Sequence, residues 1–467
     1  MGQRHPIAIA ALVAGAFYME NLDGTIIATA LPQMARSFAS DPIHLSAGMS
    51  AYLLALAVFV PISGWVADRF GARTVFGTAI GVFTFASALC GLSQNLWQFT
   101  AARVLQGIGG AMMVPVGRLV VLHNTEKKDL LRAIAYITWP GLLGPVIGPP
   151  LGGFITSYAS WRWIFFLNLP LGLVGMALAA IFVPNDRPEE RPQLDVSGFV
   201  LSGSACAALM YGVDLISHRD TPWLLAGAML AASAVFGALT LRHSNRNPRP
   251  LLDLAALKIP TFSVMIMGGS LFRMAINAMP FLLPLMFQIG FGVNAFRSGL
   301  LVLALFAGNV AMKPLTTPVL RRYGFRSVLV VNGVLAGFTM LACAFLFPRT
   351  PIAIVVATLF CGGLCRSMQF TALNTIGFAD VPPAQMSGAN TFFSTVSQMS
   401  MALGIAFGAV ALRLSLMIHR SATLAVSDFH FAFVLVGIVG VAAVYDCFGL
   451  HHDAAAVVSG HRQAAAS

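Results

Sequence analysis

The ten residues Gly64-Trp-Val-Ala-Asp68-Arg69-Phe-Gly71-Ala-Arg73 form a short polar connection between two long apolar segments. The pattern aromatic residue, glycine, any residue, arginine returns at Tyr323-Gly324-Phe-Arg326. In this alignment Arg322 matches Arg69, and each copy lies between the second and third apolar segments of a group of six. The chain therefore contains an internal repeat, with two related halves.

Composition places these segments in a membrane. Hydrophobic residues make up 57% of the 467 residues and charged residues only 10%, whereas a soluble domain carries about 25% charged residues. The net charge of +11 does not indicate nucleic acid, because the basic residues are scattered over short connections rather than gathered in one stripe. The six cysteines fall almost entirely within apolar runs, so we expect neither disulfides nor a metal site.

Fourteen apolar runs are long enough to cross a membrane, which takes about 20 helical residues. They lie near residues 8–31, 44–66, 74–93, 98–122, 133–156, 162–183, 196–214, 222–241, 261–289, 298–318, 327–347, 352–376, 388–413 and 430–449. Runs seven and eight are the weakest, and without them the total is twelve. The sequence predicts an all-α polytopic membrane protein with two six-helix halves and two extra helices between them.

The connections divide the chain further. We expect an N-terminal half over 1–183, a linker with two additional spans over 184–260, a C-terminal half over 261–450 and a disordered cytoplasmic tail over 451–467. Of the 28 Lys and Arg residues, 16 lie in connections on the side of the N-terminus, six on the opposite side and six within runs. Since cytoplasmic loops carry the excess of Lys and Arg, both termini are predicted in the cytoplasm. The first run is too long for a signal peptide and carries Glu20 and Asp23.

Five stretches resemble a known family. Gly64–Arg73 resembles the cytoplasmic signature of the major facilitator superfamily, and Arg103-Val-Leu-Gln-Gly-Ile-Gly-Gly110 resembles its second motif. Gly141-Leu-Leu-Gly-Pro-Val-Ile-Gly-Pro-Pro-Leu-Gly-Gly153 looks like the antiporter motif of its exporters. Leu22–Pro32 and Trp161–Pro170 look like the fourteen-span drug:proton antiporter branch. The resemblance implies the major facilitator fold, multidrug efflux and coupling to protons.

Two sets of residues are interpreted as gates. Arg and Asp in a short glycine-containing loop can contact helix ends of the neighbouring half and hold one access state, although ordinary positive-inside topology is the simpler explanation. Glycines four residues apart let another helix approach closely, and prolines bend the helix that carries them. The gate candidates are Gly64, Asp68, Arg69, Gly71, Arg73, Arg322, Gly324, Gly144, Pro145, Gly148, Gly152 and Gly153.

Charges within apolar runs are costly and functional by default. Asp23 and Arg103 are predicted at similar depth, from the rise of about 1.5 Å per residue, and Glu20 lies one turn from Asp23. A carboxylate that alternates between an Arg partner and a proton is a minimal proton carrier. We therefore assign proton coupling to Asp23, Glu20 and Arg103; the alternative is a static ion pair between two helices.

The second half carries bases without acids. No Asp or Glu occurs between Leu254 and Ala379, yet three bases lie within its runs, and a fourth lies at the end of run four. Buried cations need an anion, either from the substrate or from Glu20, Asp23 or helix-end carbonyls. By depth, we expect Arg366 closer to the cytoplasm than Arg273. The substrate-binding candidates are Arg273, Arg366, Arg118, Lys313, Asn277, Gln369 and Asn374.

The sequence thus predicts an inner-membrane secondary transporter that exchanges inward-moving protons for outward-moving small organic molecules. The resemblance points to drugs, and the charge pattern to anionic or carboxylate substrates or their metal chelates. A proton-coupled importer of organic anions on the same fold is the alternative. We expect no enzyme, because no nucleophile, base or metal ligands cluster, and no nucleotide-binding loop occurs. The expected partners are the lipid bilayer, protons and a small substrate, with no cofactor, no nucleic acid and a monomeric state.

Overall fold

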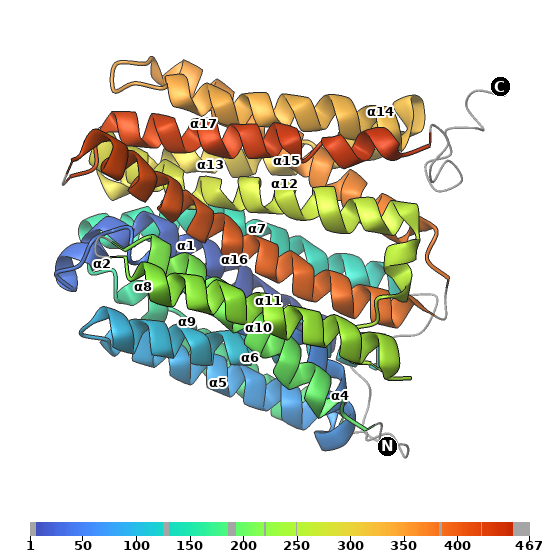
Figure 1. Ribbon diagram of the computed structural model, residues 1–467. Helices are drawn as coiled ribbons and strands as arrows, with labels where there is room; N and C mark the ends of the chain where they lie inside the picture. Colours follow the sequence, from blue (N-terminus) through green and yellow to red (C-terminus); the bar gives the residue numbers. More distant parts are fainter. Residues whose placement is uncertain are drawn as a thin grey trace.

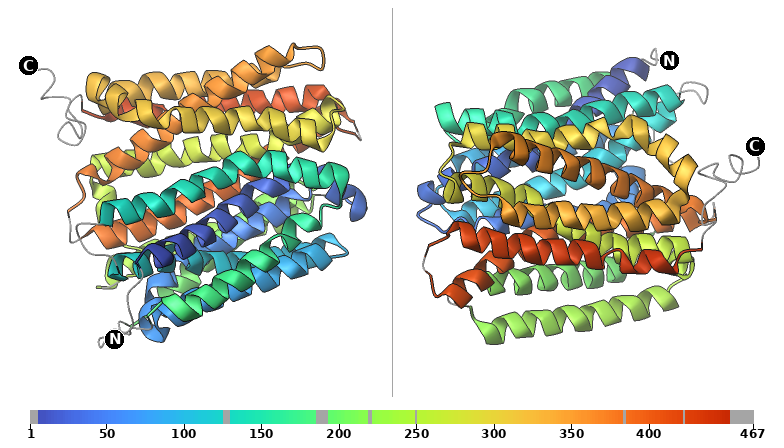
Figure 2. Two further views of the ribbon diagram at one scale, coloured as in Figure 1. Left: turned by 180° about the vertical axis from the view of Figure 1, so that it is seen from behind. Right: turned by 90° about the horizontal axis from the view of Figure 1, so that it is seen from above.

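The structure is a computed structural model that describes residues 6–124, 130–184, 193–218, 221–248, 250–382, 385–421 and 423–451. The predicted tail over 451–467 lies outside this part of the chain, apart from His451. Within the described ranges the protein is entirely helical and contains no strand, as predicted. The long helices run side by side in one bundle, and α1 begins at the same end at which the chain finishes (Figures 1 and 2). We call this the terminal end and the opposite one the distal end.

In the described residues, nine helices make up the N-terminal half of the bundle. They are α1 Pro6–Ile26, α2 Leu31–Ser37, α3 Ser46–Phe59, α4 Ser63–Phe70, α5 Ala72–Leu92, α6 Leu96–Asn124, α7 Leu130–Tyr158, α8 Trp163–Phe166 and α9 Asn168–Phe182. Helix α1 lies at its centre and packs on α6, α7 and α9, while α5 packs on α6 and α9. Short 3-10 turns, η1 at Ile27–Thr29 and η2 at Val60–Ile62, interrupt the first two spans.

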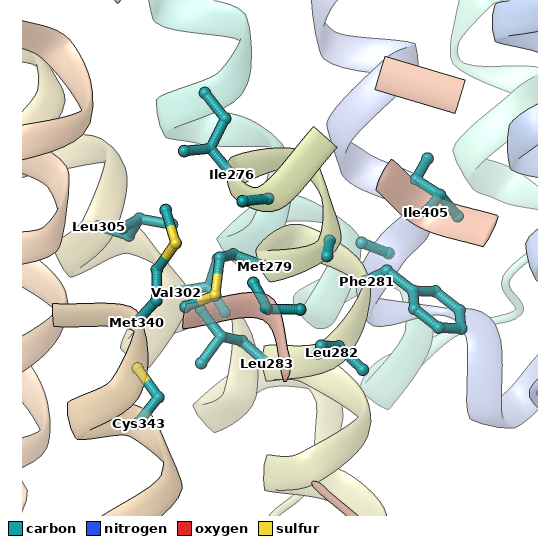
Figure 3. Close-up of a cluster of buried hydrophobic side chains, with 14 of the residues drawn as sticks. Ile276, Met279, Phe281, Leu282, Leu283, Val302, Leu305, Met340, Cys343 and Ile405 are labelled. Atoms are coloured by element: carbon teal, nitrogen blue, oxygen red, sulfur yellow. The ribbon is translucent and has the colours of Figure 1, made fainter. Parts of the chain in front are cut away.

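The C-terminal half contains α12 Pro260–Leu285, α13 Ala295–Ala311, α14 Lys313–Ala342, α15 Ile352–Ala379, α16 Met386–His419 and α17 Val426–Ala442. Helix α12 is its centre, and it continues into a π-helical turn, η4, at Met286–Gly290. Side chains of α12 such as Ile276, Met279 and Leu283 meet Leu305 of α13 and Met340 of α14 in a dense apolar core (Figure 3). All five of these side chains are less than a tenth exposed.

The two helices between the halves are α10 Val196–Ile216 and α11 Trp223–Arg246. Helix α10 packs against α3 of one half and α16 of the other, whereas α11 lies on the outside of the bundle beside α10 (Figure 2). Ala57 of α3, Met210 of α10 and Ala402 of α16 are buried where these three helices meet. The pair therefore covers one side of the contact between the halves.

The number of membrane spans can be compared with the prediction only in part. Eleven helical segments in the described chain are long and apolar enough to cross a membrane. The remaining expected spans coincide with α1, with α7 and with α13, a shorter apolar helix. The total of fourteen and the division of the chain into domains stay predictions.

The repeated loop has one backbone geometry in both halves. Gly71 ends α4 with φ 90° and ψ 136°, and Gly324 interrupts α14 with φ 72° and ψ 165°. A side chain at such a positive φ is strained, so both turns require glycine. Gly324 therefore divides α14 into a part that continues α13 and a part that forms the next expected span.

Candidate functional site

A hydrogen-bonded network around Asp23 lies buried in the N-terminal half. Arg103 of α6 donates from Nη1 to Asp23 Oδ2 at 2.5 Å and to Gln106 Oε1 at 2.6 Å. Gln106 donates from Nε2 to Asp23 Oδ1 at 2.9 Å, and Asn168 of α9 donates from Nδ2 to the same oxygen at 3.0 Å. Both amides also donate to Ser87 Oγ of α5. Both carboxylate oxygens of Asp23 therefore have donors.

The network is sealed from solvent. Asp23 and Arg103 are each 1% exposed, and the Arg103 guanidinium lies 4.2 Å from the centre of the Tyr52 ring. A buried charge pair is tolerated when further hydrogen bonds satisfy its remaining donors and acceptors. The structure thus brings together Asp23 and Arg103, which the sequence placed at one depth.

Our sequence interpretation missed three members of this network. Gln106 lies three residues after Arg103 on one helix, a spacing that puts both side chains on the same face. That spacing was readable within the motif that begins at Arg103. No comparable signal links Ser87 or Asn168 to Asp23, because they come from other helices.

Glu20 lies outside the Asp23 network. Its Oε2 is fully covered, and the described chain offers it no hydrogen-bond partner. Arg118 of α6 interacts with it electrostatically, but the Arg118 side chain is exposed and lies over the ring of Phe17 at 5.5 Å. Arg118 is therefore associated with the acids of the N-terminal half rather than with the other predicted substrate-binding residues.

Arg273 is held inside the C-terminal half without a carboxylate. Its Nη1 donates to the Met265 carbonyl at 3.1 Å and its Nη2 donates to Asn374 Oδ1 at 2.7 Å. The guanidinium also faces the rings of Phe370 and Phe393. Arg273 is 1% exposed, so in this state dipoles and aromatic faces surround its charge.

The other C-terminal candidates are separate from Arg273. Arg366 of α15 faces the Phe306 ring and a small apolar cavity beside Ile276 and Met279. Its Nη1 is buried, and the described residues provide no partner for it. Lys313 donates to Thr371 Oγ1 at 3.1 Å. The structure does not gather these three cations into one described cavity.

Our expectation that Arg366 lies closer to the terminal end than Arg273 is wrong. Ile276 and Met279, which accompany Arg366, are on the distal side of Arg273 along α12. Long side chains point back toward the N-terminus of their helix. Since α12 starts at the terminal end and α15 at the distal end, their arginines extend in opposite directions.

The predicted neutral partners are already engaged within the helices. Asn277 donates to the Arg273 carbonyl at 2.8 Å, and Asn374 accepts from Arg273. Gln369 is 2% exposed and donates to the Leu329 carbonyl at 3.0 Å. These amides support the arrangement of α12, α14 and α15.

The glycine row of α7 has two different neighbours. A Cβ added at Gly144 would lie 2.8 Å from the Leu22 nitrogen, and one at Gly152 would overlap the Ile26 carbonyl, so this row packs on α1. A Cβ at Gly153 would instead overlap the Ala295 carbonyl of α13. Gly148 belongs to the row that faces α1 and lies against Thr25. Pro145 follows Gly144 within α7.

In the described chain, hydrogen bonds join the halves on the distal side, whereas packing of α16 on α3 continues as far as η2. Phe296 N donates to Ser157 Oγ at 3.0 Å, and Gln288 Nε2 donates to the Thr29 carbonyl at 3.0 Å. The Pro149 carbonyl lies against Gly299. A hollow of about 690 Å³ opens outside these contacts, and none of the predicted substrate-binding residues lines it.

The repeated loops at the terminal end make few contacts. Arg69 and Arg73 are exposed and Asp68 is half-buried, and in the described part of the chain none of the three forms a hydrogen bond or ion pair. Gly64 is exposed beside them. In the second copy, Arg322 lies over the Tyr323 ring at 5.5 Å. The predicted contacts of this loop with helix ends of the neighbouring half, which we call the latch, are therefore not formed in this state.

Two packed helical halves with a repeated loop are the architecture of secondary transporters. The chain belongs to the Major Facilitator Superfamily, whose sequence profile matches residues 11–405. Both the predicted family and the prediction of a transporter rather than an enzyme are therefore confirmed.

Relatives and solved structures agree with this assignment. The chain is 36% identical over 411 residues to a putative multidrug resistance protein MdtD of Pectobacterium carotovorum, with 88% of each chain covered. It is 37% identical over 404 residues to the protein of that name from Citrobacter koseri, covering 86% of this chain and 85% of that one. An auto-inhibited POT family peptide transporter and a D-xylose–proton symporter each superpose with a TM-score of 0.67 at 14% identity. The first pair covers 95% of both chains, and the second covers 95% of this chain and 97% of the symporter. At this identity the two structures support the fold alone.

Proposed function

We propose that this protein is a proton-coupled exporter of small organic molecules that works by alternating access. The observation that carries the proposal is that the halves are hydrogen-bonded to each other on the distal side, while Asp68, Arg69 and Arg73 of the terminal loop form no ion pair in the described chain. A transporter whose halves rock about a central site passes through such a state. The excess of Lys and Arg in connections on the terminal side supports a cytoplasmic position for this end, with the protein in the inner membrane. Both halves of the transporter are present in one chain, which supports a monomer as the functional unit.

Protons supply the energy in this proposal. Asp23, Glu20 and Arg103 form an intramembrane set of charges, and such sets mark proton pathways in transporters. No cofactor is required for this coupling. The relatives named multidrug resistance proteins support export and drug-like substrates.

A second candidate is an anionic substrate, such as a carboxylate or its metal chelate. Arg273, Arg366, Lys313 and Arg118 supply positive charge, and the described C-terminal half has no acid within hydrogen-bonding distance of Arg273, Arg366 or Lys313. Arg binds a carboxylate through two parallel hydrogen bonds, and Asn277, Gln369 and Asn374 would have to release their present partners to join such a site. Proton-coupled import of organic anions is the corresponding alternative direction.

Transport in liposomes separates these possibilities. Purified protein is reconstituted with a pH-sensitive dye inside, and the lipophilic cation ethidium or a set of aromatic carboxylates is added under an imposed pH gradient. Export by exchange predicts that substrate and protons move in opposite directions. Movement in the same direction would contradict exchange and favour the importer. A response to carboxylates but not to ethidium would favour the anionic class.

A further inference from the structure

We infer that Glu20, rather than Asp23, is the carboxylate that takes up and releases the coupled proton. This inference rests on the proposed proton-coupled export, and it gives the two acids of α1 different roles. The Asp23 network then acts as a fixed positioning element.

Asp23 is committed to other partners. It accepts from Arg103, Gln106 and Asn168, and the two amides are held in turn by Ser87. Oδ1 of Asp23 already accepts two hydrogen bonds, and Oδ2 accepts one from the charged Arg103. Loss of the negative charge of Asp23 would leave the buried Arg103 without its counter-ion, which is costly in a water-free interior. The hydrogen bonds of Asp23 therefore favour a fixed ion pair.

Glu20 has the opposite surroundings. Its Oε2 is buried, and no described residue donates to it, so a proton can be added there without breaking a bond. Glycine at position 110 leaves space beside it, because a Cβ there would lie 3.7 Å from Glu20 Cδ and 3.3 Å from Tyr52 Oη. The Tyr52 hydroxyl is also buried and, in the described chain, without a partner. The Glu20 carboxyl, the Tyr52 hydroxyl and the Leu56 side chain therefore all lie close to Gly110.

The ionised form of Glu20 is also provided for. Arg118 interacts with it electrostatically from α6 without a hydrogen bond that would fix the carboxylate. The Arg118 side chain is exposed rather than packed inside the bundle. Tyr52 lies between the two acids, with its ring on Arg103 at 4.2 Å and its hydroxyl beside the space next to Glu20. Tyr52 thus connects Glu20 to the Asp23 network, so a change of charge at Glu20 occurs one side chain away from Arg103.

Infrared difference spectroscopy of the purified protein tests the assignment directly. Acidification should produce a carbonyl band of a protonated carboxylic acid in the wild type and in Asp23→Leu/Arg103→Met. The band should be lost in Glu20→Gln and retained at a shifted pH in Glu20→Asp. Glu20→Gln keeps the size of the side chain, so folding is expected to survive. A band that persists in Glu20→Gln and disappears in the double variant would overturn the inference.

Transport separates this inference from the proposed function. Glu20→Gln should lose proton release on addition of ethidium but retain ethidium exchange in the absence of a pH gradient. Undiminished proton release in Glu20→Gln would refute the role of Glu20 while leaving proton-coupled export intact. If the wild type itself moves no protons with ethidium or the carboxylates, the proposed coupling fails and the inference fails with it.

Discussion

At the residue scale, the same kind of side chain has very different surroundings in the two halves. Arg103 donates to a carboxylate within a closed network, whereas Arg273 has a backbone carbonyl, an amide and two aromatic rings. Both are 1% exposed. The charge of Arg103 is therefore balanced within the protein, while that of Arg273 is only solvated by dipoles. This difference is the strongest structural reason to consider an anionic ligand in the C-terminal half.

The Asp23–Arg103 pair leads to a stability prediction. Asp23→Leu leaves Arg103 buried and unpaired, and removing one partner of a buried pair costs about 3–5 kcal/mol. Replacing both by apolar residues, as in Asp23→Leu/Arg103→Met, should recover more than half of that loss. Thermal unfolding of the purified variants measures both effects. Equal destabilisation by the single and double variants would show that the two charges are not coupled.

At the element scale, helix α7 connects two interfaces through adjacent residues. Gly152 faces α1 within one half, whereas Gly153 faces α13 of the other half. Because a Cβ at either position would overlap a backbone carbonyl, each substitution must separate the helix pair concerned. The two positions therefore distinguish packing within a half from contact between halves.

We predict that Gly153→Ala shifts the conformational equilibrium and that Gly152→Ala lowers stability. Separation of α7 from α13 weakens the distal contact and should increase the reactivity of a cysteine placed in the pathway toward a membrane-impermeant thiol reagent added at the distal side. Separation of α7 from α1 damages the core of one half and should lower the melting temperature instead. Identical behaviour of the two variants would contradict the division of roles.

The helix pair α10–α11 is attached at the distal end by a histidine contact. The rings of His44 and His218 lie 4.6 Å apart, and Arg413 of α16 donates to the His218 carbonyl at 3.2 Å. The hydrogen bond to Asp214 raises the pKa of His218. Burial is the main cause that lowers the pKa of His44, and the positive charges of His218 and Arg413 lower it further. The negative charges of Asp41 and Asp214 raise it, but by less.

These shifts predict opposite pH dependences. The stabilisation from His218 is complete below its ordinary pKa of about 6.5 and is lost as pH rises through the higher folded value. His44 opposes folding when protonated, so its penalty grows as pH falls below about 6.5. His218→Gln should therefore lower the melting temperature at pH 5 more than at pH 8, while His44→Gln should raise it at pH 5. Parallel pH curves for both variants and the wild type would contradict this pairing.

At the scale of the whole molecule, the two access states compete. The present state is joined near the distal end, and Asp68, Arg69 and Arg73 make no ion pair in the described chain. If these residues latch the terminal end in the other state, their loss penalises only that state. A ligand or variant shifts an equilibrium only through such a difference between states.

We therefore predict that Asp68→Asn favours the state seen here. Cysteines in the pathway should become more accessible from the cytoplasm and less accessible from the opposite side, with little change in melting temperature. Asp253→Asn, in the connection before α12, serves as the control. Unchanged accessibility from both sides would mean that the repeated loop sets topology only.

The sequence by itself determined the membrane class, the helical fold, the repeat and the family. Those properties depend on long apolar runs, on loop glycines that positive φ requires at Gly71 and Gly324, and on local motifs. It also placed Asp23 and Arg103 at one depth, because the rise per residue converts position along a helix into depth.

Only the tertiary structure decided which helices are neighbours. Lipid and helix surfaces are similarly apolar, so hydropathy does not specify lateral partners. The sequence therefore could not show that Ser87 and Asn168 complete the Asp23 network or that Gly152 and Gly153 face different halves. Nor could it show that Glu20 Oε2 has no hydrogen-bond partner in the described chain. It also misplaced Arg366 relative to Arg273, because depth along a helix does not include the direction of a long side chain, which antiparallel helices reverse.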